Sequence, residues 1–259
     1  MTSERLGPEK FRTREKYLLY LRHVFAYEFA KSTVLPTDYV LDVGCGTGYG
    51  TNILGAVAKM TDGLDTNMPT AIYTSWGVLF RRYDGINIPA RDNAYDVIVA
   101  FHILEHINDD AAFVGELYRV LRPGGRLLLT TPNRVYRLKP GQHPWNPFHL
   151  REYDVDSLKN VLLQVFPDVG MLGVCGSPEV QAIEHARLAW ALRGGLLSAI
   201  RRAVPDSVKS IIYAVMGCCR RPQDFTGKYS TDDFYVTGEN VENSLDLMAV
   251  CQKPRRDIS

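Results

Sequence analysis

A glycine-rich segment follows the first strongly apolar run of the chain. It reads Asp42-Val43-Gly44-Cys45-Gly46-Thr47-Gly48-Tyr49-Gly50. Glycines let the backbone turn tightly and bring its amides close to a ligand. A dinucleotide site needs room and bare amides for a pyrophosphate, and the carboxylate of Asp42 would repel that anion. The segment therefore indicates a ligand site that favours a cationic group over a pyrophosphate.

Four of the six histidines lie in two segments that should converge over one pocket. His102 and His106 flank Glu105 just after one apolar run, and His143 and His149 follow the next one. Imidazole and carboxylate groups bind metals, and imidazole titrates near neutrality, so it can also accept a hydroxyl proton. The concentration of these residue types predicts a chemically active pocket.

Two interpretations of these residues remain open. In the first, a divalent metal orients and acidifies a substrate hydroxyl and is bound by His102, Glu105, His106 and His149. Three imidazoles would favour Mn, Fe or Zn over Mg, because imidazole is a softer ligand than carboxylate. In the second, one histidine is a general base without a metal, and His149 and His106 are the leading candidates, with Glu105 beside them.

The segment 132–151 is a long loop rich in Pro, Asn and aromatic residues. Loops of this length more often contribute to function than serve only as connections. Trp145 and Phe148 could stack on a sugar or aromatic ring of a substrate, or they could simply anchor the loop. His143 stands next to Pro144 and is a candidate for contacting the substrate or for shaping the loop.

Apolar strands that alternate with helical patterns must position these residues. We expect strands at 39–43, 61–64, 95–101, 126–131, 169–174 and 245–251, and helices at 14–31, 109–121 and 156–166. This alternation predicts an α/β fold with a mostly parallel sheet that is covered on both faces. Ligands of such folds bind at the carboxyl ends of the strands, which is where the glycine and histidine segments stand.

The composition is that of a globular chain and excludes several classes of protein. Of 259 residues, 46% are hydrophobic and 23% charged, which argues against wholesale disorder. Lys and Arg number 30 against 29 Asp and Glu, so a nucleic-acid partner has no support from net charge. The five cysteines form no CxxC pair and no stretch of about 18 apolar residues occurs, so we expect a cytoplasmic protein.

The ordered set of motifs resembles the class I S-adenosylmethionine-dependent methyltransferases. The first motif of that family reads like Val40 to Gly50. Gly63-Leu64-Asp65 resembles the acidic end of its second strand, and the stretches 84–98 and 119–125 resemble two later motifs. The resemblance implies a Rossmann-like, seven-stranded, mostly parallel sheet with an antiparallel last strand. It also implies S-adenosylmethionine as the cofactor.

The resemblance assigns roles residue by residue. Asp65 would hold the ribose hydroxyls, and Asp84 would accept from the adenine amino group. The full cofactor set that it implies is Asp42, Gly44, Cys45, Gly46, Gly48, Asp65, Thr66, Asn67, Asp84, Gly85, Phe101 and His102.

Two groups within the family resemble the histidine segments more closely. Some small-RNA 2′-O-methyltransferases and ubiquinone-pathway O-methyltransferases have a Glu-x-x-Glu-His stretch after this strand, and this chain departs from it by having His102 in place of the first Glu. In the small-RNA enzymes a later histidine, at a place resembling His149, completes a metal site. The string 146–153 resembles methyltransferases of bacterial polysaccharide and glycolipid pathways, which favours a sugar or glycan hydroxyl as the acceptor.

Two further segments surround the expected core. Residues 1–35 would form a helical lid across the cofactor, with Tyr27 facing the substrate, before a core at 36–175 and a last strand and tail at 241–259. Residues 176–240 would be a mainly helical insertion, and its stretch 187–221 carries seven basic residues and one acid. That stretch could cap the active site, form a homodimer, or contact the inner face of an anionic membrane.

The sequence therefore predicts methyl transfer from S-adenosylmethionine to a hydroxyl oxygen of a small molecule, with a sugar or glycolipid as the acceptor. Rival interpretations keep the fold and change the acceptor to RNA or to a nitrogen atom. A further rival is a catalytically inactive cofactor-binding protein that docks through the basic insertion.

Overall fold

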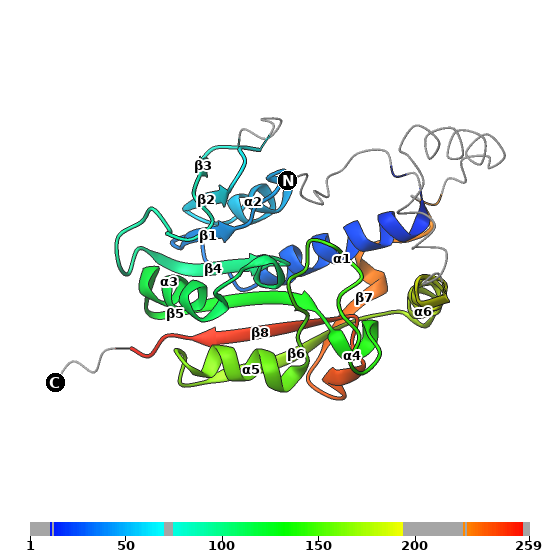
Figure 1. The fold of residues 1–259 in the computed structure, drawn as a ribbon. Helices are drawn as coiled ribbons and strands as arrows, with labels where there is room; N and C mark the ends of the chain where they lie inside the picture. The colour runs from blue at the N-terminus through cyan, green and yellow to red at the C-terminus, as the bar shows by residue number, and fades with distance from the viewer. Residues whose placement is uncertain (1–10, 12, 70–74, 194–224, 226, 256–259) are drawn as a thin grey trace, which may run out of the picture.

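The computed structural model describes residues 11, 13–69, 75–193, 225 and 227–255. One eight-stranded sheet has the order β3-β2-β1-β4-β5-β8-β6-β7 (Figure 1). Its strands are β1 (Tyr39–Val43), β2 (Met60–Asp65), β3 (Val78–Arg82), β4 (Tyr95–Phe101), β5 (Leu121–Pro132), β6 (Val169–Gly176), β7 (Phe234–Thr237) and β8 (Asp246–Gln252). The first five strands pair in parallel, and β8 lies antiparallel between β5 and β6.

The predicted α/β sheet with an antiparallel last strand is confirmed, and it has one strand more than expected. The additional strand, β7, pairs with β6 at the edge of the sheet. The sequence pattern also failed to show β3 at the opposite edge, because three of its five residues are exposed or charged and only one face touches the core. These edge strands lack the continuous run of apolar residues from which β1 and β4 were predicted in the sequence.

Helices cover both faces of the sheet. The helices are α1 (Arg14–Lys31), α2 (Tyr49–Gly55), α3 (Asp110–Val120), α4 (Arg134–Arg137), α5 (Val155–Leu163) and α6 (Pro178–Arg193), with short 3-10 turns at Leu104–His106, Thr231–Asp233 and Val241–Asn243. Residues of α3 and α5 share one buried cluster with the strands, and residues of α1 and α2 share another. A third cluster joins α1 to α6 and β7.

The helix starts follow local chemistry. The side chains of Thr13, Asp109 and Asp154 cap α1, α3 and α5 by accepting bonds from backbone N–H groups of the first turn. The predicted helix over residues 14–31 has the bounds of α1. The predicted strand at 126–131 begins earlier, at Leu121. Pro123-Gly124-Gly125 forms an irregularity within β5, where Gly124 has a φ of 83° and the pairing with β4 shifts register between Tyr95 and Val97.

The insertion is described in part. The expected helical pattern after residue 178 is seen as α6, and residues 194–224, which hold most of the basic stretch 187–221, lie outside the described residues. Within the part of the chain that is described, no helix is both long and apolar enough to cross a bilayer.

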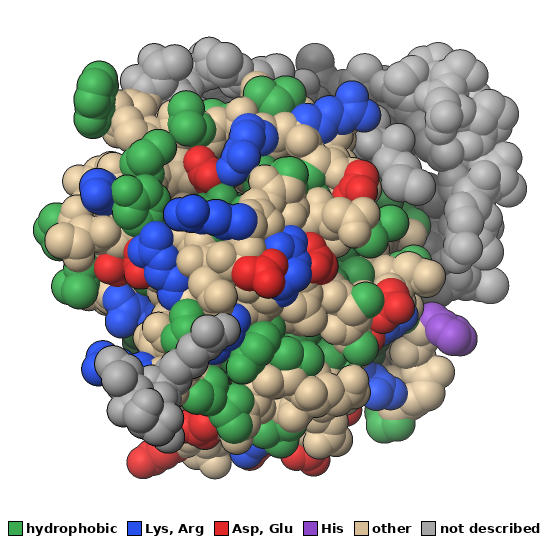
Figure 2. Space-filling model, turned by 90° about the vertical axis from the view of Figure 1, so that its left-hand side faces the viewer, with side chains coloured by type: hydrophobic (Ala, Val, Ile, Leu, Met, Phe, Trp, Pro, Cys, Tyr) green, Lys and Arg blue, Asp and Glu red, His purple; other side chains and the backbone are tan. Residues whose placement is uncertain are grey.

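The carboxyl ends of β4 and β5 point toward the side of the molecule where α1, α4 and α6 gather (Figure 1). On the opposite side, Lys and Arg side chains are interspersed with Asp and Glu (Figure 2). Pairing of Pro132 with Asp246 places the first residue of antiparallel β8 at the same edge as the carboxyl ends of its neighbours. The functional side chains are therefore expected at that edge.

Candidate functional site

The glycine turn connects β1 to α2 in a backbone conformation that favours glycine. Gly44, Gly46 and Gly48 have φ values of 79°, 57° and 87°. The backbone N–H groups of Gly44 and Cys45 donate to the carbonyl of Leu64, at 2.7 and 3.0 Å, and tie the turn to β2. A Cβ atom on Gly46 would meet nothing within 4 Å, so this part of the backbone borders open space.

Asp65 ends β2 and supports the turn with both carboxylate oxygens. Its Oδ2 accepts from the N–H of Gly46 and its Oδ1 from the N–H of Asn67, each at 2.9 Å. A carboxylate can accept both hydroxyl protons of a ribose diol. The open backbone beside Gly46 and this fixed carboxylate fit the predicted cofactor.

Asp42 lies beneath the turn rather than facing solvent. It is fully buried and accepts from the Tyr27 hydroxyl at 3.1 Å and the Thr51 hydroxyl at 2.7 Å. Burial raises the pKa of Asp42 to about 7, although these two hydrogen bonds oppose the rise. Tyr27, which the sequence suggested for the substrate, therefore fastens helix α1 to the turn. Its ring fills the space that a Cβ on Gly50 would need.

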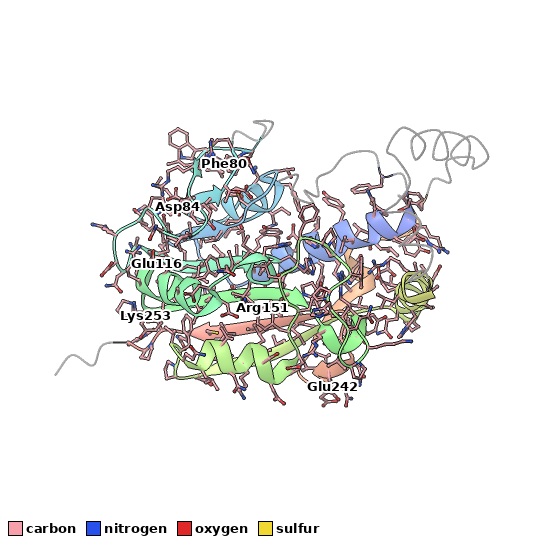
Figure 3. All side chains as sticks on the ribbon, viewed as in Figure 1. Phe80, Asp84, Glu116, Arg151, Glu242 and Lys253 are labelled. Carbon is pink, nitrogen blue, oxygen red and sulfur yellow. The ribbon has the colours of Figure 1, made fainter. Side chains whose placement is uncertain are left out.

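The predicted adenine side lies by β2 and β3, where Asp84 and Phe80 are found (Figure 3). The carboxylate of Asp84 accepts from the backbone of Ile86 and Asn87 at 2.8 and 2.7 Å, and these bonds, with that of the Asn87 amide, hold its pKa below the usual value. Gly85 has a φ of 86°, and a Cβ there would lie 3.2 Å from Thr66. Thr66 and Gly85 are thus brought together as the resemblance implied.

His102 follows Phe101 at the end of β4 and lies between two buried carboxylates. Its Nε2 is 3.2 Å from Asp246 and its Nδ1 is 3.4 Å from Glu105. Burial opposes its charge, but Asp246 and Glu105 outweigh burial and raise the pKa of His102 to about 9. Asp246 also pairs with Arg22 of α1 at 2.8 Å, so one buried ionic network joins α1, β4 and β8.

Asp246 and Arg22 were missed from the sequence. Asp246 is the first residue of the antiparallel strand β8, so it lies at the same edge of the sheet as the carboxyl end of β5. An acidic residue at the start of a predicted antiparallel strand was the sequence signal that could have identified it. Arg22 offered no signal, because a single Arg within a helical pattern ordinarily faces solvent. His23, one residue further on, stacks on His102 with ring centroids 4.2 Å apart.

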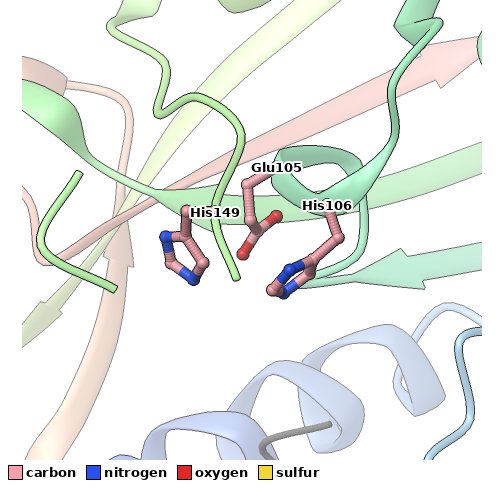
Figure 4. A group of neighbouring side chains, drawn as sticks. All are labelled: Glu105, His106 and His149. Carbon is pink, nitrogen blue, oxygen red and sulfur yellow. The ribbon is translucent and has the colours of Figure 1, made fainter. Parts of the chain in front are cut away.

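Glu105, His106 and His149 form a compact group (Figure 4). One ligand atom from each lies within 4.8 Å of the others, and Glu105 is fully buried between the two rings. Burial would raise the pKa of Glu105, but the histidines around it, chiefly His102, hold that pKa below the usual value. Glu105 is therefore a carboxylate at neutral pH and can stabilise a cation beside it.

Both imidazoles of the group are oriented by their Nδ1 atoms. Nδ1 of His106 donates to the carbonyl of Phe148, and Nδ1 of His149 lies against Oε1 of Glu152, each at 2.8 Å. A carbonyl only accepts, so Nδ1 of His106 carries the proton and its Nε2 has the lone pair in the neutral ring. The same tautomer of His149 is favoured by the Glu152 carboxylate.

His102 does not join this group, although it was predicted as a fourth ligand. Both of its ring nitrogens face carboxylates, and its raised pKa keeps it protonated at neutral pH, which leaves no lone pair for a metal. The group that could hold a metal thus contains one carboxylate and two imidazoles.

The loop after β5 folds over the group. The N–H of Leu150 donates to the carbonyl of Glu105 at 2.9 Å, which fixes the loop against the turn after β4. Trp145 and Phe148 are each 39% exposed, so neither ring is packed into the core. His143 is exposed as well and does not join the group of Glu105, His106 and His149.

A family model described as "Methyltransferase domain" matches residues 11–165, which is more than half of the chain. The chain belongs to this family. A relative from Mycolicibacterium smegmatis is named "Probable S-adenosylmethionine-dependent methyltransferase" and is 32% identical over 272 residues. The alignment covers 98% of this chain and 95% of the relative. S-adenosylmethionine is accordingly the cofactor of the enzyme.

More distant comparisons agree with this assignment. A ubiquinone biosynthesis O-methyltransferase from Parvibaculum lavamentivorans is 28% identical, over 54% of this chain and 67% of that protein. The solved structure of a SAM-dependent methyltransferase from Thermotoga maritima aligns with a TM-score of 0.56, 16% identity and coverage of 92% and 95% of the two chains. This last likeness shows the fold alone.

Proposed function

We propose that the enzyme transfers the methyl group of S-adenosylmethionine to a hydroxyl oxygen of a sugar or glycolipid. The observation that carries the proposal is the group of Glu105, His106 and His149 at the edge of the sheet where the glycine turn lies. An oxygen acceptor must lose its proton as it attacks, and this group contains two oriented imidazoles beside a carboxylate.

When bound, S-adenosylmethionine supplies an electrophilic methyl group on a positively charged sulfur. The Nε2 atom of His149 or His106 accepts the hydroxyl proton. Glu105 then stabilises the imidazolium that forms, and Glu152 does so for His149 through Nδ1. Asp65 and the glycine turn hold the cofactor, and the Tyr27–Asp42 bond fastens the lid over it.

The same group has the donor set of a divalent metal site. Its two imidazoles have their Nδ1 atoms engaged, which is the usual arrangement of metal-bound histidine. Oε1 of Glu105 is buried and forms an ion pair with Nδ1 of His102 at 3.4 Å, without hydrogen-bond geometry to any described residue. Two imidazoles and one carboxylate suit Mn, Fe or Zn, and Mg less well. Such an ion would acidify the acceptor hydroxyl.

Two features support oxygen as the acceptor atom and a ring-shaped acceptor. The relative from Parvibaculum lavamentivorans is named as an O-methyltransferase. The exposed rings of Trp145 and Phe148 offer stacking surfaces for a sugar ring next to the histidines.

The test is methyl transfer from radiolabelled S-adenosylmethionine to a panel of sugars, with structured RNA as a separate arm. The variants His149→Gln and His106→Gln should each lower kcat at least about 100-fold, which is the usual contribution of a general base. The matched control His143→Gln should keep kcat within about twofold, because its ring lies in solvent.

Treatment with EDTA followed by Mn, Zn or Mg separates the two modes of hydroxyl activation. Loss of turnover that Mn or Zn restores supports the metal, and unchanged turnover supports the histidine base. The proposal is wrong if both histidine variants retain the parent kcat, or if only RNA or amines are methylated.

A further inference from the structure

Two arginines face the ring of Trp145 beside the candidate active site. The guanidinium carbon of Arg137, on α4, lies 4.5 Å from the ring centroid, and that of Arg187, on α6, lies 5.3 Å from it. Cations at such distances are attracted to the face of an indole ring. The loop, α4 and α6 thus gather two positive charges around one partly exposed aromatic side chain.

Arg137 is connected to the catalytic group through one carboxylate. Oε2 of Glu152 accepts from Nε of Arg137 at 3.1 Å, while Oε1 of the same carboxylate faces Nδ1 of His149 at 2.8 Å. Glu152 is fully buried at its side chain. The guanidinium of Arg137 is therefore one side chain away from an imidazole that can accept the acceptor's proton.

The donors of these arginines are only partly used. The side chain of Arg137 is 8% exposed, yet its two terminal nitrogens have no hydrogen-bond partner among the described residues. Arg187 uses Nε and Nη2 on Glu184, at 2.8 and 2.7 Å, and its Nη1 has no partner within the same part of the chain. A guanidinium has five N–H donors. None of these open donors is among the buried unpaired atoms of the described residues, so they are accessible to a ligand.

Arg137 and Arg187 each pair with one buried carboxylate, that of Glu152 and that of Glu184. Burial lowers the pKa of Arg137, Glu152 opposes this, and the nearby guanidinium groups of Arg187 and Arg22 lower the pKa further. An anion placed on the terminal nitrogens of Arg137 would supply the hydrogen-bond acceptors that these nitrogens lack among the described residues. The two terminal nitrogens of a guanidinium match the paired oxygens of a carboxylate or a phosphate.

We propose that Arg137 and Arg187 bind an anionic group of the acceptor, a phosphate or a carboxylate, and that Trp145 contacts the ring that carries it. The inference rests on the proposed function and narrows its substrate to an acidic sugar or a sugar phosphate. The anion would lie on the side of His149 where Glu152 and Arg137 lie. From there it would orient the acceptor hydroxyl toward Glu105, His106 and His149.

The first test measures anion binding without any methyl transfer. The full chain, loaded with S-adenosylhomocysteine, is titrated calorimetrically with inorganic phosphate and separately with acetate, at constant ionic strength. Saturable binding of one of the two anions is expected. Arg137→Lys and Arg187→Gln should each weaken it at least about tenfold, since each removes charge-assisted hydrogen bonds.

Arg134→Gln is the matched control on α4. Arg134 is 42% exposed at its side chain and pairs with Asp154 at 3.6 Å, away from Trp145, so its loss should leave anion binding unchanged. Arg187→Gln keeps the test valid if Arg137→Lys fails to fold, because the side chain of Arg187 is 25% exposed. Absence of saturable binding of both anions, or equal binding by the parent and a folded arginine variant, overturns the proposal.

The second test compares glucose, glucose 6-phosphate and glucuronate as methyl acceptors. A kcat/KM at least about tenfold higher for one of the acidic sugars is expected, and Arg187→Gln should abolish that preference. Equal efficiency with glucose would overturn the anion site while leaving hydroxyl methylation intact. Anion binding without transfer to any of the three sugars would count against the proposed function and leave the anion site supported.

Discussion

Replacement of Asp42 by Asn should make the free enzyme more stable at neutral pH. Burial raises the pKa of Asp42 to about 7 in the folded state, whereas the carboxyl of an unfolded chain has its ordinary value of 3.8. A raised pKa means that the folded state holds its proton more tightly. The stability that this proton provides is complete below pH 3.8 and is lost as the pH rises to about 7.

The size of the effect follows from the pKa difference. Each pKa unit corresponds to about 1.36 kcal/mol, so a rise from 3.8 to about 7 amounts to at most roughly 4 kcal/mol at pH 7.5. Asn has no such titration and keeps nearly the same shape. The hydroxyls of Tyr27 and Thr51, which donate to Asp42, can rotate to serve an amide.

The assay is urea unfolding of the parent and the Asp42→Asn variant from pH 4.5 to 7.5, without cofactor. The difference between their free energies of unfolding should change by a few kcal/mol in favour of Asn as the pH rises. Asp154→Asn is a control of opposite sign, because the Ser157 hydroxyl lowers the pKa of Asp154. Parallel curves for the parent and Asp42→Asn would refute the reasoning, since they would show that Asp42 titrates normally.

Two further substitutions test the cofactor site and the lid. In the Asp65→Asn variant, the amide NH2 group must face the N–H of Gly46 or that of Asn67, which leaves one of these donors without an acceptor. The Kd for S-adenosylmethionine, measured by calorimetry, should therefore rise about 10- to 100-fold. An unchanged Kd would contradict the role of Asp65. Arg22→Met leaves Asp246 without its buried guanidinium partner and should lower the free energy of unfolding by roughly 3 kcal/mol in urea. The same change at Arg14, which is 45% exposed at its side chain on the same helix, should lower it by less than about 0.5 kcal/mol, and equal losses would show that the ion pair contributes nothing specific.

The sequence was most informative where several signals coincide at one strand end. The glycine turn, Asp65 and the Glu105-His106 pair each follow a continuous apolar strand, and parallel strands bring their carboxyl ends to one edge. The convergence of His149 on Glu105 was foreseen from loop order alone. The structure confirms that proximity through the bond from Leu150 N–H to the Glu105 carbonyl.

Long-range pairing could not be obtained from single-chain patterns. The functions suggested for Tyr27 and His102 depend on which carboxylate each meets, and those partners, Asp42 and Asp246, are 15 and 144 residues away. A histidine whose two ring nitrogens both face carboxylates is a charged structural residue. The same histidine with the lone pair of one ring nitrogen free could bind a metal. The distinction depends on burial and register, which emerge only when the strands are assembled.

The proposed activity is methyl transfer to a hydroxyl oxygen. Its most direct test is a reaction with S-adenosylmethionine that carries a 13C-labelled methyl group, followed by NMR assignment of the labelled carbon in the product. We expect a methyl ether on an acidic sugar or sugar phosphate, formed by the parent chain and lost in His149→Gln. Label found on a nitrogen atom, or ether formation that survives without both His106 and His149, would contradict it.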